Sequence, residues 1–407
     1  MLFLYNLMAA GAGLVLKIIA LFSPKIKLFV DGRKNVFKTL GNKIAPSDKT
    51  IWFHAASLGE FEQGLPVMQK MRELHPGRKI VLTFFSPSGY EVRKNTDAAD
   101  VTVYLPLDTK KNATKFLALI HPEMAFFIKY EYWPNYLQEL KQRNVPVYLF
   151  SGIFRKEQVF FKWYGQFYRN ALGAFKMFFV QNESSKLLLQ EIGFDNVKVS
   201  GDTRFDRVLK ILERDNSLDF IEKFKDNKVT VVAGSTWPKD ESQLGGFINA
   251  SSGVKFIIAP HNVKPDQIAA LKNSISKKTI LFSEIQHKNP AGYDVFIIDA
   301  VGILTKIYSY ADIAYVGGGF GTSGLHNILE PAVFGIPIII GPNFQKFSEA
   351  VALVNMGGCV AVRSKKELEE TLAFLIQNED ERHERGHISS TFVQMNKNAT
   401  EVILKNL

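Results

Sequence analysis

A glycine-rich loop followed by a polar run is the part of this sequence best suited to chemistry. Residues 316–342 read VGGGFGTSGLHNILEPAVFGIPIIIGP, with an apolar stretch on each side of the loop. Backbone N–H groups in such a loop can bind a phosphate. We expect a helix to start with His326, Asn327 and Glu330, so that the Glu330 carboxylate can reach a ribose. This pattern is typical of a nucleotide-sugar site.

The glycines alone are weaker evidence, because a strand that meets a helix closely also needs them. No lysine follows the loop, which disfavours a P-loop triphosphatase. A dinucleotide-binding fingerprint lies near the first strand of its domain, whereas these glycines come late in the chain. The polar run after the loop is what favours a ligand site over a structural turn.

A second polar cluster, HAASLGEFEQ, occupies residues 54–63. We expect a strand to end at His54 and a helix to begin near Glu60, at the mouth of a cleft. A carboxylate there can act as the general base for an incoming hydroxyl. Alternatively, Glu60 complements the helix dipole and Ser57 caps the helix. The residues alone leave both interpretations open.

Composition sets the size and the class of the protein. A chain of 407 residues with 46% hydrophobic residues is too long for one ordinary core, so we expect two domains. The single cysteine, Cys359, excludes disulfides within the chain and Cys-cluster metal sites, and it fits a reducing compartment. The net charge of +10 suggests an anionic partner: nucleic acid, anionic lipid or a phosphorylated substrate.

The N-terminus is almost wholly apolar over residues 2–22, interrupted by Asn6 and Lys17. This length nearly suffices to cross a hydrocarbon core, and no basic residue precedes it as in a signal peptide. Basic residues follow, which places the remainder in the cytoplasm. We expect a membrane-anchor helix over residues 1–24; spanning, interfacial and buried arrangements remain open because of Lys17.

Alternating strand and helix patterns follow, and they predict an α/β fold with parallel, doubly wound sheets. We expect a first Rossmann-like domain over residues 25–205, a linker over 206–228 and a second Rossmann-like domain over 229–407, facing each other across a cleft. The predicted strands cover residues 50–55, 79–84, a stretch near 101, 124–128, 145–150, 229–233, 255–259, 279–282, 295–298, 313–316 and 336–340. Ligands then bind at the carboxyl ends of the strands.

Aromatic and basic residues alternate over residues 150–179, including Arg155, Lys162 and Arg169. Such a segment can stack nucleobases, but no nucleic-acid module accompanies it. We favour an anionic membrane surface as its partner, with no nucleic acid. An ordinary core helix with a basic solvated face is the alternative.

Six motifs follow one another along the chain: HAASLGEFEQ at 54–63, KYEYWPN at 129–135, SGIFR at 151–155, SGDTRFD at 200–206, AGSTWPKDE at 233–241 and GLHNILEP at 324–331. Together with the basic, apolar N-terminus, they resemble the 3-deoxy-D-manno-octulosonic acid (Kdo) transferases of lipopolysaccharide synthesis. The resemblance runs to about residue 362.

This resemblance implies a GT-B glycosyltransferase at the cytoplasmic side of the bacterial inner membrane. It further implies transfer of Kdo from CMP-Kdo to a lipid A precursor, lipid IVA, with inversion and without a metal ion or cofactor. By motif position, Glu60 corresponds to the general base and Glu131 to a second functional carboxylate on the acceptor side. The positions that match the donor site are Ser235, Thr236, Gly318, Gly319, Asn327 and Glu330, with Glu330 on the ribose of CMP.

The chain departs from the family pattern at one place. Many members have Pro-Arg-His after an apolar strand of the second domain, where this chain has Pro260, His261 and Asn262. His261 would be a weaker, pH-dependent contact to the donor phosphate, with Lys264 as a compensating cation; capping or solvent exposure is the alternative.

Two other functions stay open: a GT-B enzyme that uses a UDP-sugar, and a nonenzymatic nucleotide sensor on the membrane.

Overall fold

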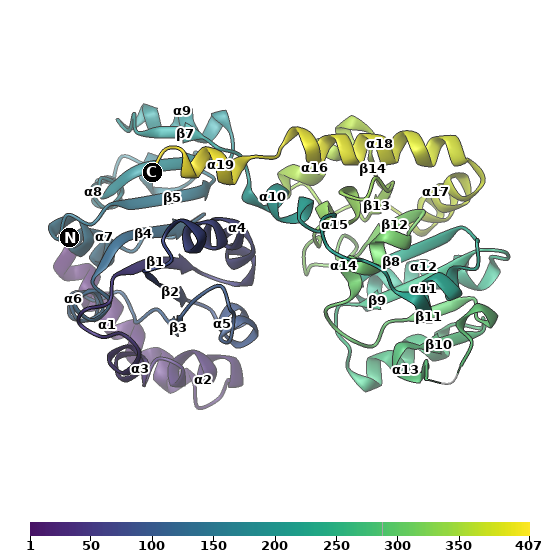
Figure 1. Ribbon diagram of the computed structural model, residues 1–407, viewed down its shortest axis with the longest axis horizontal. Helices are drawn as coiled ribbons and strands as arrows, with labels where there is room; N and C mark the ends of the chain where they lie inside the picture. The colour runs from purple at the N-terminus through teal and green to yellow at the C-terminus, as the bar shows by residue number, and fades with distance from the viewer. Residues whose placement is uncertain (287) are drawn as a thin grey trace. The chain divides into compact units, whose positions relative to one another are not determined.

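The computed structural model describes residues 1–286 and 288–407, which form two compact units. The first unit contains Met1–Arg207 and Lys397–Leu407, and the second contains Val208–Asn396. Each unit is built around one seven-stranded sheet whose strands all run parallel (Figure 1). This architecture confirms the predicted α/β class.

The first sheet has the strand order β3-β2-β1-β4-β5-β6-β7. Its strands are β1 (Thr50–Ala55), β2 (Lys79–Phe84), β3 (Val101–Tyr104), β4 (Pro122–Ile128), β5 (Val147–Gly152), β6 (Phe175–Val180) and β7 (Val197–Val199). The helices of this unit are α1 (Leu2–Ile19), α2 (Pro24–Asp31), α3 (Val36–Lys43), α4 (Leu58–Leu74), α5 (Pro87–Arg93), α6 (Lys110–Ile120), α7 (Pro134–Gln142), α8 (Gln166–Leu172), α9 (Glu183–Glu191) and α19 (Ala399–Leu404), and α10 (Thr203–Leu209) ends just beyond it.

The second sheet has the order β10-β11-β9-β8-β12-β13-β14. Its strands are β8 (Thr230–Thr236), β9 (Lys255–Pro260), β10 (Thr279–Leu281), β11 (Val295–Ile297), β12 (Ile313–Val316), β13 (Ile338–Ile340) and β14 (Cys359–Ala361). The helices are α11 (Asp219–Lys225), α12 (Pro238–Ala250), α13 (Pro265–Ser274), α14 (Leu304–Ile307), α15 (Leu329–Ala332), α16 (Ser348–Met356), α17 (Lys365–Gln377) and α18 (Glu379–Met395).

Both faces of the first sheet are buried, which explains why its strands read as continuous apolar runs. Trp52 of β1 belongs to one hydrophobic core cluster, whereas its neighbours Ile51 and Phe53 belong to another. Because successive side chains of a strand point to opposite faces, these two clusters lie on opposite sides of the sheet. All six residues of β1 are buried.

The strand order of each sheet reverses at one place, and the predicted site residues follow the strands at these places. In the first sheet the reversal lies between β1 and β4, and in the second between β8 and β12. Loops that leave the carboxyl ends of two such strands diverge to opposite sides and open a crevice, where open α/β sheets bind ligands. The fold thus selects one edge of each sheet as a candidate site.

The sequence predicted β1, β2 and β12 at their observed bounds, but missed three strands. These are β6, β7 and β14. Two of them, β7 and β14, are three-residue strands at the edge of a sheet, too short for a periodic pattern. The third, β6, lies in the aromatic and basic segment, whose composition suggested a surface.

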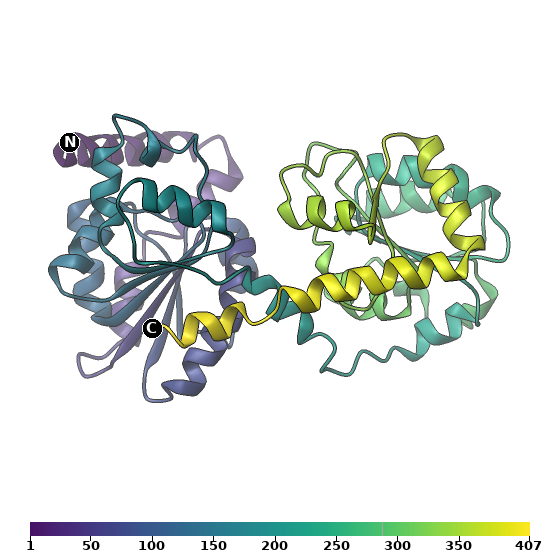
Figure 2. The ribbon, with the colours of Figure 1, turned by 90° about the horizontal axis from the view of Figure 1, so that it is seen from above.

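The two ends of the expected second domain also differ from the structure. Residues 206–228 are not a simple linker, because α11 packs Ile221 and Phe224 into the interior of the second unit. At the other end, α19 belongs to the first unit, where Ile403 is fully buried (Figure 2). Backbone N–H groups of Asn398 and Thr400 donate to the Asp206 carboxylate, both at 2.6 Å, and hold this return in place.

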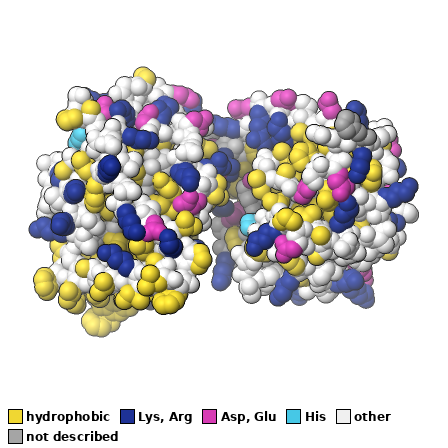
Figure 3. Space-filling view, turned by 90° about the horizontal axis from the view of Figure 1, so that it is seen from below, with side chains coloured by type: hydrophobic (Ala, Val, Ile, Leu, Met, Phe, Trp, Pro, Cys, Tyr) yellow, Lys and Arg dark blue, Asp and Glu magenta, His cyan; other side chains and the backbone are white. Residues whose placement is uncertain are grey.

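The apolar N-terminal helix α1 lies along the first unit and is held by polar contacts. Tyr5 donates its hydroxyl to Asp108 Oδ2 at 2.7 Å, and Asn6 donates to Asn135 Oδ1 at 3.2 Å. Its 18 residues are long and apolar enough to cross a membrane, and none of them is buried. Figure 3 shows hydrophobic side chains gathered along the lower edge of the unit that carries α1.

Candidate active site

A buried histidine and a carboxylate meet at the carboxyl edge of the first sheet. His54, near the end of β1, is fully buried, and its Nε2 lies 3.1 Å from Oε2 of Glu131 in the loop after β4. Trp133 Nε1 donates to the same oxygen at 2.8 Å. Burial, followed by the charge of Glu131, raises the pKa of Tyr132 well above its usual range. The Glu131 carboxylate is thus held by two ring nitrogens.

Glu60 stands in the first turn of α4, on the loop that leaves β1. The positive end of this helix favours a negative charge there. Ser57 precedes the helix but caps none of its backbone N–H groups; its hydroxyl donates to Glu60 Oε2 instead. Because β1 and β4 are adjacent in the sheet, Glu60 and Glu131 follow neighbouring strands at the same edge.

The glycine-rich loop of the second unit allows three backbone segments to approach closely. Gly318 follows β12 with φ of 95°, and a Cβ on it would lie 2.1 Å from the carbonyl oxygen of Gly324. A Cβ on Gly319 would lie 2.6 Å from the backbone nitrogen of Gly341, which follows β13. Side chains cannot fit at either position, so these glycines are required by packing.

The backbone N–H of Gly318 has a partner within the protein. This N–H donates to Oδ2 of Asp240 at 2.9 Å, inside the unit. Asp240 is fully buried, and it also accepts from the Tyr315 hydroxyl at 2.7 Å and from the Trp237 N–H at 2.9 Å. A buried carboxylate therefore shapes the loop and satisfies that donor.

The predicted hydroxyl pair ends β8, beside the glycine-rich loop. Ser235 adopts a left-handed backbone, with φ of 53°, and Gly317 packs against its carbonyl. The buried Thr236 donates its hydroxyl to Glu241 Oε1 at 2.9 Å, so this hydroxyl is engaged within the unit. Desolvation raises the pKa of Glu241.

The polar run after the loop starts its helix later than expected. Helix α15 begins at Leu329, so His326 and Asn327 precede it. Asn327 accepts the N–H of Leu329 at 3.1 Å and donates to Glu330 Oε1 at 3.2 Å. The two residues thus form one polar unit at the start of the short helix, and Asn327 orients the carboxylate.

His261 is exposed to solvent, and its ring also takes part in an aromatic stack. Its ring stacks on Trp237, with centroids 4.6 Å apart, and lies 4.5 Å from the ring of His326. The Trp237 indole donates to His326 Nε2 at 3.0 Å. Burial lowers the pKa of both histidines, and that of His326 falls to about 4. Both rings are therefore neutral near pH 7.

The three predicted membrane cations have different surroundings. Arg169 donates to the carbonyl oxygens of Phe160 and Lys162, at 2.8 and 3.0 Å, and so supports the turn before α8. The guanidinium of Arg155 lies 5.7 Å from the centre of the Tyr130 ring. Trp163, in the turn that Arg169 supports, is 90% exposed. The turn presents an aromatic ring to solvent.

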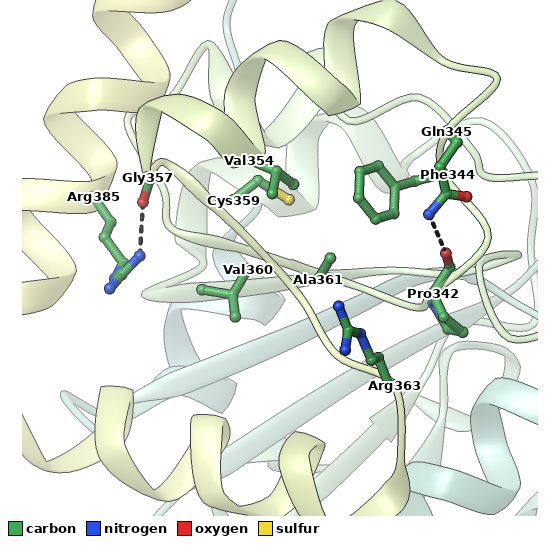
Figure 4. Close-up of a pocket in the computed structure, with 10 residues that line it drawn as sticks. All are labelled: Pro342, Phe344, Gln345, Val354, Gly357, Cys359, Val360, Ala361, Arg363 and Arg385. Atoms are coloured by element: carbon green, nitrogen blue, oxygen red, sulfur yellow. Dashed lines mark hydrogen bonds between the residues drawn. The ribbon is translucent and has the colours of Figure 1, made fainter.

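A cavity of about 420 Å³ lies in the second unit, beside the edge strand β14 (Figure 4). Its lining includes Phe344, Gln345 and two arginines, Arg363 and Arg385. Arg385 donates to the carbonyl of Gly357 at 2.8 Å and so closes one side. None of the predicted site residues lines this cavity. We therefore place the candidate site from the positions of the predicted side chains and not from this cavity.

Sequence reasoning missed the residues that support the predicted ones. Asp240 lies three residues after Trp237, the spacing of a helix capping box, and this was a usable signal. The partnership of His54 with Glu131 had no such signal, because the two are 77 residues apart. Among residues 1–286 and 288–407 no group of three potential metal ligands occurs.

Comparison with known proteins agrees with the motifs. Residues 32–207 match the sequence profile of 3-deoxy-D-manno-octulosonic-acid transferases. The chain is 29% identical to such a transferase from Chlamydophila psittaci, over 88% of this chain and 86% of that one. It is 24% identical to another from Haemophilus influenzae, over 96% and 94% of the two chains.

Solved structures share the fold. A UDP-GlcNAc 2-epimerase from Neisseria meningitidis superposes with a TM-score of 0.62 at 16% identity, covering 88% of this chain and 99% of that one. MurG from Acinetobacter baumannii gives 0.55 at 11% identity, covering 88% and 98%. These likenesses support the predicted GT-B fold class, and the sequence matches show that this chain is similar to Kdo transferases over most of its length and is a glycosyltransferase.

Proposed function

We propose that this enzyme transfers Kdo from CMP-Kdo to a lipid A precursor, lipid IVA, with inversion at the anomeric carbon and without a metal ion. The observation that carries the proposal is the pair of carboxylates, Glu60 and Glu131, at the carboxyl edge of β1 and β4 in a chain similar to Kdo transferases. The first unit binds the acceptor in this proposal, and the second unit binds the donor.

In the proposed reaction Glu60 is the general base. It removes the proton of the acceptor hydroxyl while the hydroxyl oxygen attacks the anomeric carbon of Kdo. The bond from that carbon to the phosphate oxygen breaks, and CMP leaves with the electron pair. A single displacement of this kind inverts the anomeric carbon. The donated hydrogen bond from Ser57 orients the Glu60 carboxylate without occupying its second oxygen.

In this proposal the donor binds at the carboxyl edge of the second sheet. A carboxylate that accepts ribose hydroxyls must be held firmly, and Asn327 holds Glu330 in this way. The aromatic stack of Trp237 and His261 lies on the same edge, after β8 and β9. Since His261 is neutral near pH 7, we propose that it contacts the nucleotide as a hydrogen-bonding partner rather than as a fixed charge.

We further propose that α1 lies flat on the cytoplasmic face of the bacterial inner membrane. Contacts from Tyr5 and Asn6 tie this helix along the first unit, which does not suit a helix that crosses the bilayer. Its opposite side exposes Phe3, Leu4, Leu7, Met8, Leu14, Val15, Ile18 and Ile19. An apolar helical face of this kind enters the boundary between headgroups and acyl chains.

Mass spectrometry of the product made from CMP-Kdo and a tetraacyl lipid A precursor tests the proposal. We expect the acceptor to gain one or more Kdo units, with unchanged yield in EDTA. Transfer from a UDP-sugar instead would replace the proposed donor, and inhibition by EDTA would overturn the metal-free mechanism. If no sugar is transferred although CMP binds, a nucleotide sensor would be favoured.

A further inference from the structure

The buried His54 is a polar residue of the first unit to which the proposed mechanism gives no role. It lies in the interior at the carboxyl end of β1, where a polar ring without partners would be costly. Both ring nitrogens have partners. Nδ1 lies 2.8 Å from the Thr83 hydroxyl on β2, and Nε2 lies 3.1 Å from Glu131 Oε2 and 3.0 Å from Trp133 Nε1.

The hydrogen-bond geometry places a proton between His54 and Glu131. An imidazole nitrogen and a carboxylate oxygen at 3.1 Å are both acceptors unless one of them is protonated. The Trp133 Nε1–H faces both Glu131 Oε2, at 2.8 Å, and His54 Nε2, at 3.0 Å, and the carboxylate oxygen is its nearer acceptor. With the Trp133 proton on Glu131, we infer that His54 Nε2 carries the proton between the histidine and the carboxylate. The Thr83 hydroxyl accepts from Trp52 Nε1 and can donate to His54 Nδ1 at 2.8 Å, which is nearer than its alternative acceptor, the carbonyl oxygen of Phe53 at 3.3 Å.

We propose that His54 is a positioning residue for Kdo transfer, which uses its Nε2–H to fix the Glu131 carboxylate toward the acceptor. This inference rests on the proposed function. His54 has no exposed surface, so it cannot touch the substrate itself. The Glu131 side chain is 12% exposed, and among the described residues its Oε1 has no partner. One oxygen is tethered to two ring nitrogens, which leaves the other for an acceptor hydroxyl.

Replacement of His54 by two residues of different hydrogen-bonding capacity tests the tether. His54→Phe keeps a planar ring but removes the donor, whereas the side-chain amide of His54→Gln can still donate to Glu131. We expect His54→Phe to lower kcat about 10- to 100-fold, the effect of losing one hydrogen bond to a charged group. The affinity for CMP should stay within about twofold, and His54→Gln should recover most of the kcat.

A double-mutant cycle separates positioning from a merely structural role. If His54 acts through Glu131, then Glu131→Gln and the double variant His54→Phe with Glu131→Gln should have the same kcat. Losses that multiply would overturn the proposal. Should His54→Phe fail to fold, Trp133→Phe is the second test, because it removes the other donor to Glu131. The decrease in kcat that Trp133→Phe causes in the wild-type protein should be absent when Glu131→Gln is already present.

A measurement that needs no turnover distinguishes this proposal from the proposed function. In protein labelled with ¹⁵N-histidine, we expect the His54 Nε2 signal at pH 7 to have the chemical shift of a protonated nitrogen, assigned by its loss in His54→Gln. An unprotonated Nε2 would overturn the tether even if Kdo is transferred. If the wild-type protein transfers no Kdo, the proposed function fails, and a protonated Nε2 would still show the tether.

Discussion

The backbone N–H of Gly318 donates to the buried carboxylate of Asp240 at 2.9 Å. The sequence suggests this loop for phosphate binding, and a hydrogen bond to Asp240 of α12 fixes its conformation from within the second unit. Its shape is set before a ligand arrives, because the same carboxylate accepts two further hydrogen bonds. Preorganisation of this kind reduces the cost of ordering a loop on binding.

Removal of this carboxylate should destabilise the second unit. Asp240→Ala leaves three donors without a partner, and at about 1 kcal/mol or more for each we expect the free energy of unfolding to fall by about 3 kcal/mol. Urea unfolding measures this loss. Tyr315→Phe removes a single donor and is the matched control, with an expected loss near 1 kcal/mol. Equal losses in the two variants would contradict the central role of Asp240.

The two proposed carboxylates of the reaction should have separable effects. Glu60→Gln removes the base and should lower kcat by about 10²- to 10⁴-fold, with unchanged CMP-Kdo binding. Glu330→Ala should instead weaken CMP-Kdo binding, because it removes the ribose contact that Asn327 orients. Steady-state kinetics and calorimetry with CMP measure both effects. A Glu60→Gln enzyme with normal kcat would refute the assignment of the base.

The neutral His326 should make the stability of the second unit depend on pH. Burial, and then the neighbouring His261, lower the pKa of His326 from 6.5 to about 4. Between these values the unfolded chain binds a proton that the folded unit does not, so stability falls as pH drops from about 6.5 toward 4. Each pKa unit corresponds to about 1.4 kcal/mol, and allowing for partial exposure we expect a loss of about 1 to 2 kcal/mol.

Urea unfolding at pH 7 and pH 4.5 checks this pH dependence. His326→Gln is the matched variant, because a Gln carbonyl can accept from the Trp237 indole but does not titrate. The wild-type protein should lose more stability than the variant on acidification. The same loss in both proteins would show that other groups cause it.

Membrane binding should depend on the exposed turn before α8. Trp163→Ser removes the most exposed large side chain of this turn, and Lys162→Glu reverses a charge beside it. We expect both changes to weaken flotation with anionic vesicles, by about 1 kcal/mol for the charge. Lys366→Glu, on α17 of the second unit, is the charge-reversal control; its side chain is 85% exposed, whereas Lys162 is partly buried. We exclude Arg169 from this test because it supports the turn itself. Equal binding by wild type, both variants and control would remove the turn from the interface.

Local sequence determined most of the sheet architecture. Largely apolar runs such as residues 50–55 and 313–316 became β1 and β12, because strands covered on both faces need mostly apolar side chains. The order of the six motifs along the chain likewise indicated the family. Short edge strands such as β14 carry no such pattern, since three residues hold too little periodicity to detect.

What only the tertiary structure decided is which distant residues meet. His54 joins Glu131 across 77 residues, and Gly318 joins Asp240 across 78. These contacts depend on the order and register of strands that are neighbours in space and remote in sequence. Hydrophobic pattern specifies burial residue by residue, whereas the pairing of strands is a property of the whole chain, and so the supports of the candidate site emerge only when the sheets are assembled.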